Sequence, residues 1–230
     1  MRNTLIAFLL ILISNVVFTQ TNSATTTTDN WKQNNFNKKI YAFVGEKIYI
    51  ENYIKPQAIE DYKINVSEGD TLRKTFIQMD YGYKAKYKVI KNINNEIKAS
   101  EVEFIAFDHH GIPPFSKGKN ALLFLIKENE KFYHCKYQYF EVFKTSDNKW
   151  AGIYDKIKYK NTTIKPVKID FKADVTIILN DYLKKHRYFL FPKKYFKHID
   201  NKVVTNYGNY VEDLFSIKKE GILKARGYFK

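Results

Sequence analysis

The chain is poor in the residues that cross-link or interrupt a fold. It has one cysteine in 230 residues, Cys135, so neither an internal disulfide nor a cysteine-based metal site can form. Cys135 lies in a strand-like run, residues 132–139, and a buried thiol is expected there because buried cysteine packs as a small hydrophobe. Glycine (nine) and proline (five) are also scarce, while Tyr and Phe number 18 each. That balance favours β-strands.

The motifs of the common enzyme classes are missing as well. The sequence contains no Gly-x-Ser-x-Gly, no P-loop, no His-Glu-x-x-His and no Gly-x-Gly-x-x-Gly. No two acidic residues stand out as an acid and base pair. These absences favour a protein that is not an enzyme, but they leave a glycosidase open, because its carboxylates follow no local motif.

A long apolar run occurs once, at the beginning of the chain. Arg2 precedes an apolar stretch from Leu5 to Phe18 that is too short to span a bilayer comfortably. We interpret residues 1–20 as a secretory signal peptide, with an uncleaved anchor as the alternative. No cysteine follows the run, which excludes a lipoprotein anchor. The mature chain is therefore expected to be secreted or periplasmic, with no transmembrane span.

The next segment, residues 21–39, is polar and rich in threonine and asparagine. Such a composition cannot bury apolar surface, so we expect a flexible linker. The folded part is predicted to begin with the continuously apolar run Ile40–Val44, which is typical of a strand covered on both faces. Gly45 then indicates a bulge or bend.

Strict alternation between two faces marks residues 81–89. The odd positions are aromatic or apolar, and the even positions carry three lysines, Lys84, Lys86 and Lys88. Side chains alternate in this way in a strand, so one face is expected to pack on a core. A second alternating segment follows with Glu101 and Glu103 among its polar positions. The lysines of one strand could then lie opposite the glutamates of the next.

Residues 40–154 continue as alternating or apolar segments separated by short turns, which predicts a β-rich domain. A change of phase at Phe140 and Val142 indicates a bulge. Residues 165–230 differ, because apolar side chains recur at helical spacing over 175–183 and again over 207–215. The predicted fold class is α+β: an antiparallel barrel or strongly curved sheet, followed by a helical C-terminal segment packed on it.

The strand series over residues 40–127 resembles the netrin-like, tissue-inhibitor-of-metalloprotease-like OB-barrel pattern. The residues concerned are Phe43–Ile48, Tyr83–Lys91, Val102–Phe107 and Ala121–Ile126. The resemblance implies a five-stranded closed barrel with a binding role. Inhibition through an N-terminal disulfide-linked cysteine is not implied, because no cysteine is present there. The overall composition looks like that of a secreted Bacteroidetes-type protein.

The formal net charge of +15 favours anionic partners. The lysines are interspersed along the chain, which is typical of a solvated surface. Nucleic acid is disfavoured as a partner, because the strand alternation places tyrosines and lysines on opposite faces and because the protein is expected to be secreted. An envelope protein or an anionic glycan is expected instead.

The candidate binding residues are Asp108, His109 and His110, which precede a Gly/Pro-rich loop, and His134 on a later strand. Histidine and aspartate can bind zinc, but this spacing matches no metal motif, and neighbouring histidines in a strand point to opposite faces. We therefore predict neither a metal nor a cofactor.

The sequence favours a non-catalytic binding or interaction module of the bacterial cell envelope. The alternative is a hydrolase of envelope polymers that uses carboxylates and His109 in the 108–118 loop. A third possibility is a structural protein whose C-terminal segment docks a partner, which an exposed apolar patch there would favour.

Overall fold

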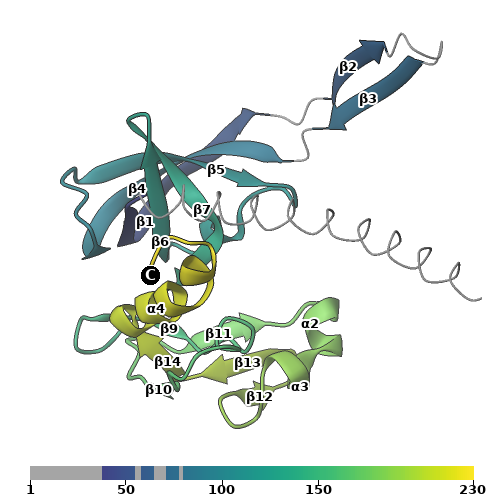
Figure 1. Ribbon diagram of the computed structural model, residues 1–230. Helices are drawn as coiled ribbons and strands as arrows, with labels where there is room; N and C mark the ends of the chain where they lie inside the picture. Colours follow the sequence, from purple (N-terminus) through teal and green to yellow (C-terminus); the bar gives the residue numbers. More distant parts are fainter. Residues whose placement is uncertain (1–37, 55–57, 65–70, 78–79) are drawn as a thin grey trace, which may run out of the picture.

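The computed structural model describes residues 38–54, 58–64, 71–77 and 80–230 (Figure 1). The predicted signal peptide and nearly all of the predicted linker lie outside these residues. The described chain is mostly β-strand with a small C-terminal helix, so the α+β prediction is confirmed. None of its helices is long and apolar enough to cross a membrane.

Five strands form what we call the five-stranded ring: β1 (Ile40–Ile54), β4 (Tyr81–Asn94), β5 (Glu101–Asp108), β6 (Asn120–Glu128) and β7 (Lys131–Glu141). Their hydrogen-bonded order is β1-β4-β5-β7-β6, and β6 pairs back to β1. All pairs are antiparallel except the short β5–β7 contact. Between β1 and β4 the chain forms a separate two-stranded sheet of β2 (Ala58–Ile64) and β3 (Thr71–Ile77).

The remaining residues, 143–230, form what we call the C-terminal unit. Its strands are β8 (Phe143–Lys144), β9 (Trp150–Ile153), β10 (Val167–Lys168), β11 (Val175–Ile178), β12 (Lys197–Ile199), β13 (Lys202–Thr205) and β14 (Tyr207–Tyr210). They form two sheets, β10-β14-β9-β8 and β11-β13-β12. The helices are α2 (Asp181–Lys185), α3 (Arg187–Leu190) and α4 (Val211–Lys218), and α4 is followed by a distorted turn, Lys219–Leu223.

The prediction of a helical C-terminal segment over 165–230 is wrong for most of its length. The apolar stripe at 175–183 begins as strand β11, because Val175-Thr176-Ile177-Ile178 is a run of β-branched residues, which favour strands. The second stripe is divided between strand β14 and helix α4. At Gly208 the backbone lies so close to Gly152 of β9 that a Cβ atom could not be accommodated, which fixes this residue in the sheet.

Two strands before residue 154 pair with the chain that follows it. Strands β8 and β9 were expected to complete the β-rich domain, but β9 pairs with β14 and β8 pairs with β9. Both strands therefore belong to the C-terminal unit.

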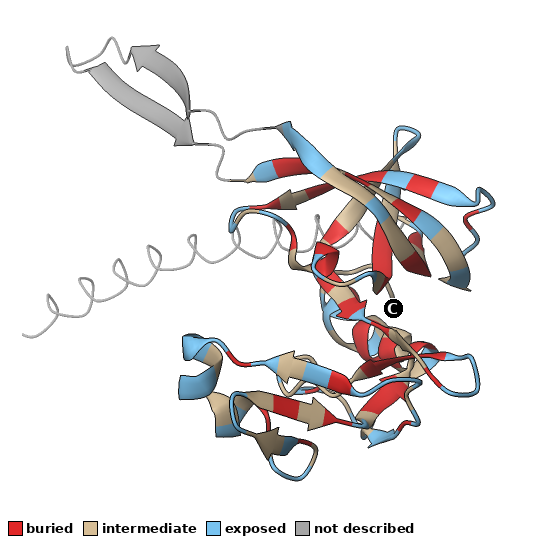
Figure 2. Ribbon diagram, turned by 180° about the vertical axis from the view of Figure 1, so that it is seen from behind, coloured by how far each residue is buried: buried red, intermediate tan, exposed pale blue. Residues whose placement is uncertain are grey.

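The continuously apolar run Ile40–Val44 is covered on both faces, as predicted. Phe43 packs in the interior of the five-stranded ring, whereas Ala42 and Val44 belong to a second buried cluster that includes Leu214 and Ile217 of α4. Strand β6 is divided in the same way. Buried residues occur both in the strands of the ring and in the C-terminal unit (Figure 2). The register of β1 shifts between Val44 and Gly45, which confirms the predicted irregularity there.

The lysine face of β4 lies opposite the glutamates of β5, as predicted. Lys86 is the cross-strand partner of Glu103, and Lys88 that of Glu101. Diagonal ion pairs join Lys84 to Glu103 and Lys86 to Glu101. Glu103 also accepts a 2.6 Å hydrogen bond from the Tyr49 hydroxyl, and this bond is the largest cause of its lowered pKa.

Phe115 closes the interior of the five-stranded ring. This residue lies in a 3₁₀ turn, Pro114–Ser116, in the loop between β5 and β6, and it is 2% exposed. Its ring centroid lies 6.1 Å from that of Tyr87, 5.8 Å from that of Phe104 and 4.5 Å from that of His134. A loop side chain thus fills the space that five strands alone leave open.

Replacing Phe115 by alanine is expected to lower the free energy of unfolding by about 3–5 kcal/mol, because it leaves a cavity among aromatic rings. Chemical denaturation measures the change. The control is Phe189→Ala, which removes the same atoms from a side chain that is 60% exposed and should cost less than about 0.5 kcal/mol. Equal losses in the two variants would show that Phe115 does not act as a core residue.

Candidate functional site

The structure places Asp108, His109 and His110 together at one edge of the five-stranded ring. Asp108 is buried at the end of β5 and accepts a 2.8 Å hydrogen bond from the backbone N–H of His110. The two histidines are exposed, with ring centroids 3.7 Å apart. Asp108 therefore fixes the turn, and both imidazoles face solvent.

Two further residues complete this edge. His109 Nδ1 lies 2.8 Å from the Tyr137 hydroxyl and 3.6 Å from Asp80 Oδ1. The Asp80 carboxylate is already paired with Lys136, whose Nζ lies 2.7 and 2.6 Å from its two oxygens. Within the described residues, no group of three or more His, Cys, Asp or Glu side chains is placed to hold a metal ion.

His134 is separated from the other three candidates, because its imidazole lies in the interior of the five-stranded ring, against the side chain of Phe115. Burial lowers its pKa to about 3. The imidazole is therefore neutral near pH 7, and its Nε2–H donates a 2.9 Å hydrogen bond to the Gln138 carbonyl oxygen. The four sequence-predicted residues thus form one exposed edge and one packing histidine, and do not converge on a common pocket.

The hydrogen bond from His134 closes a wide bulge in β7. The pairing with β6 jumps from Leu125–His134 to Leu123–Tyr139, and within the bulge Tyr137 adopts a positive φ of 65°. The sequence indicated a bulge near Phe140, and the structure places it a few residues earlier. Gln138 Oε1 accepts a 2.9 Å hydrogen bond from Lys218 Nζ of α4. Burial lowers the pKa of Lys218 to about 8.

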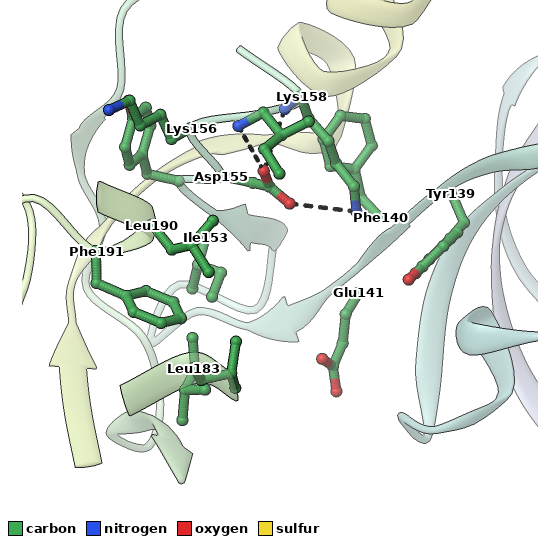
Figure 3. A pocket seen from close by; sticks show the side chains of 13 residues that line it. Tyr139, Phe140, Glu141, Ile153, Asp155, Lys156, Lys158, Leu183, Leu190 and Phe191 are labelled. Carbon is green, nitrogen blue, oxygen red and sulfur yellow. Dashed lines mark hydrogen bonds and ion pairs between the residues drawn. The ribbon is translucent and has the colours of Figure 1, made fainter. Parts of the chain in front are cut away.

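A cleft of about 290 Å³ lies between β7 and the C-terminal unit (Figure 3). Its apolar wall is formed largely by aliphatic and aromatic side chains of the C-terminal unit: Ile153, Ile177, Leu183, Leu190 and Phe191. From the ring side, β7 contributes Tyr139, Phe140 and Glu141. Clefts of this kind, mostly apolar with a few polar groups, are the usual form of ligand sites.

Asp155 and Lys158 form the polar wall of the cleft, in the segment that follows β9. The Asp155 carboxylate accepts hydrogen bonds from the backbone N–H of Ile157 at 2.9 Å and of Lys158 at 3.1 Å. Lys158 Nζ lies 3.7 Å from Asp155 Oδ2 and 4.3 Å from the ring centroid of Tyr139. Burial lowers the pKa of Lys158 despite the nearby carboxylate.

Glu141 is the polar group of the cleft that is left open to a ligand. Figure 3 shows Glu141 between Leu183 and Tyr139, and its carboxyl group lies against Gly118 of the loop before β6. Partial desolvation raises the pKa of Glu141, although the residue as a whole is exposed, and no other described residue gives it a hydrogen bond or an ion pair within 4 Å. A bound molecule that offers a hydroxyl, amide or amine donor could satisfy this carboxyl group.

Sequence reasoning did not identify this site. Glu141 ends a strand and Asp155 follows another, fourteen positions later, with no motif around either residue. They line one cleft because β9, which pairs with β14, packs against the end of β7, where Gly152 lies against Phe140 and Glu141. A local pattern could not have revealed that arrangement.

The chain matches no known family model, and it has no significant match among curated proteins or solved structures. The site is therefore interpreted from its own geometry.

The low pKa of His134 predicts acid sensitivity. The unfolded chain binds a proton at this histidine below about pH 6.5, whereas the folded chain does so only near pH 3, so stability falls as the pH drops between these values. Between pH 6.5 and 4.5 we expect wild type to lose about 2–3 kcal/mol more than His134→Gln, because each pKa unit corresponds to about 1.4 kcal/mol.

Denaturant titrations at several pH values measure this difference. The matched control is His110→Gln, at an exposed position, which should keep the wild-type pH dependence. If His134→Gln also kept it, the imidazole would not be buried in its neutral form.

Proposed function

We propose that this protein is a non-catalytic binding module of the bacterial cell envelope, secreted or periplasmic, which holds its ligand in the cleft between the five-stranded ring and the C-terminal unit. The observation that carries the proposal is Glu141, a carboxyl group with a raised pKa and no partner among the described residues, above an apolar wall. Because Glu141 is exposed, a ligand can reach this carboxyl group and replace water as its hydrogen-bond donor.

The scaffold supports this proposal. The ring order, in which the third and fifth strands are parallel neighbours, is the one expected of an OB-like barrel. Such barrels serve as binding modules, for oligosaccharides among other ligands. The netrin-like resemblance of residues 40–127 implies the same architecture, so the two lines of argument agree on a binding role.

The chemistry of the cleft favours a glycan over a flat protein surface. Hydroxyl groups would donate to Glu141, and the apolar face of a sugar ring would lie against Leu183 or Leu190. The net charge of +15 would attract an anionic polymer from a distance. An envelope glycan of acidic character is therefore the preferred ligand, and an envelope protein the second.

A hydrolase of envelope polymers is the alternative, and one observation favours it. Glu141 and Asp155 both line the cleft, and a carboxyl group with a raised pKa is what a general acid requires. Against it, Asp155 already accepts two backbone hydrogen bonds and lies near Lys158, which limits its use as a base or nucleophile. His109 lies outside this cleft lining.

A sedimentation assay with purified peptidoglycan sacculi tests the proposal. We expect the wild-type chain to pellet with the sacculi and to release no soluble sugar fragments. Glu141→Gln should weaken binding about 10-fold or more, because it removes a charge-assisted hydrogen bond. The matched control is Glu96→Gln, the same change at an exposed turn of the ring, which should bind as wild type does.

The two functions predict opposite results for the same variant. Soluble fragments that appear with wild type and disappear with Glu141→Gln, while binding is kept, would establish the hydrolase and overturn the binding module. Failure of the wild-type chain to pellet would exclude peptidoglycan as the ligand.

A further inference from the structure

Helices α2 and α3 project from the C-terminal unit at the end remote from α4 (Figure 1). With the adjoining residues they form what we call the tip: residues 178–194 together with Lys156 and Ile157. Five large apolar side chains of the tip are between 60% and 66% exposed: Ile157, Ile178, Tyr182, Tyr188 and Phe189. A concentration of exposed apolar side chains on one projection marks an interaction surface.

The tip is also strongly basic. It carries Lys156, Lys184, Lys185, Arg187, Lys193 and Lys194, against one acidic residue, Asp181, which pairs with Lys184 at 3.5 Å. Within the described chain, Lys185, Lys193 and Lys194 have no acidic side chain within ion-pair distance. Instead, cations lie over the exposed rings: Lys156 Nζ is 3.8 Å from the centroid of Phe189, and Lys193 Nζ is 5.4 Å from that of Tyr188.

Polar contacts hold the exposed rings in place. Arg187 donates hydrogen bonds to His198 Nδ1 at 2.8 Å, to the Asp200 carbonyl at 2.7 Å and to the Lys202 carbonyl at 3.2 Å. The Tyr188 ring stacks on His198, with centroids 5.1 Å apart and planes 8° apart. Arg187 therefore joins α3 to the sheet behind it, and the Tyr188 ring is held against His198 of that sheet.

We propose that the tip docks on the surface of an anionic lipid bilayer. Tyr182, Tyr188 and Phe189 would lie at the level of the headgroups, where aromatic side chains are favoured, and the lysines would contact lipid phosphates. The exposed aliphatic residues Ile157 and Ile178 decide between a bilayer and an anionic glycan. A glycan could use the lysines and the rings but would leave the isoleucines in water, whereas a bilayer buries them.

The proposal has a consequence for the cleft. Leu183 and Leu190 lie on the same two short helices and line its apolar wall. Docking through the tip would hold the cleft close to the membrane surface. The docking itself is independent of whether the cleft binds a glycan.

A fluorescent label at the tip tests the docking on the full chain. Phe189→Cys in a Cys135→Ala background is labelled with an NBD dye and mixed with vesicles of equal parts phosphatidylglycerol and phosphatidylcholine. We expect a blue shift and a gain in intensity. The apolar N-terminal run can adsorb to vesicles by itself, so the same label at Lys98→Cys, on an exposed turn of the ring, is the control and should stay in water.

Charge reversal separates the tip from the overall charge. Lys185, Lys193 and Lys194 changed together to Glu should lower the vesicle partition coefficient measured by the tip label at least about 100-fold, from the usual contribution of a lysine near an anionic surface. The matched control changes Lys88, Lys98 and Lys131 to Glu. These lysines are equally exposed but lie on the ring, and the control should retain most of the binding.

Three results would overturn the proposal. The first is a tip label that stays in water with anionic vesicles at low salt, while circular dichroism shows a folded chain. The second is an equal loss of binding in the two triple variants, which would indicate attraction by net charge alone. The third is binding of soluble dextran sulfate at the tip lysines without any blue shift on vesicles, which would identify a polyanion site.

Discussion

The packing of α4 against β1 and β6 is the constraint on which the rest of the molecule depends. These two strands bury both faces, one in the interior of the five-stranded ring and one against Leu214, Ile217 and Leu223. Without α4, the outer faces of the two strands would expose apolar side chains, and β9 would lose its packing beside β7. The cleft exists because this contact holds the C-terminal unit at a fixed distance from the ring. Its position is therefore a product of core packing and requires no flexible loop.

The bulge in β7 connects that packing to the polar interior. Where β7 leaves the regular ladder, its backbone needs other partners, and His134 and Gln138 supply them. Gln138 in turn accepts from Lys218 of α4, and Arg226, further along the chain, donates to the Lys136 carbonyl oxygen. Burial lowers the pKa values of both Lys218 and His134, which is the energetic cost of placing such groups inside. The bulge thus places polar side chains inside the fold, a few residues before the position at which the sequence indicates a bulge.

The sequence predicted those parts of the fold whose signal is local. Period-two alternation predicted β4 and its pairing with β5, and the apolar run Ile40–Val44 predicted a strand covered on both faces. The helix predicted at residues 175–183 was wrong. Three of its apolar positions fit both the helical spacing and the two-residue spacing of a strand, and the run of β-branched residues favours the strand that forms. The four candidate site residues were chosen by residue type, and the structure separates Asp108, His109 and His110, at one edge of the ring, from His134, which packs against Phe115. The cleft escaped prediction because Glu141 and Asp155 come together only through the pairing of β9 with β14, which is a property of the whole C-terminal unit.

Lysines are surrounded by different side chains on strand β4 and at the tip. On β4, Lys84, Lys86 and Lys88 face β5, which offers two glutamates, so their charge is balanced locally and the surface is an ordinary solvated sheet. At the tip the one acidic side chain is Asp181, which pairs with Lys184, and Lys156 and Lys193 lie over exposed aromatic rings. A bias toward lysine in the sequence would enrich both places equally, so it cannot explain why the lysines of β4 have glutamates opposite them while Lys185, Lys193 and Lys194 have no acidic partner among the described residues. Nor does it explain why the tip also exposes isoleucines, which a solvated basic face does not need. The two surfaces therefore differ in their partners. The lysines of the five-stranded ring pair with carboxylates of their own chain, whereas the tip lysines suit the proposed anionic lipid bilayer, which also has an apolar interior.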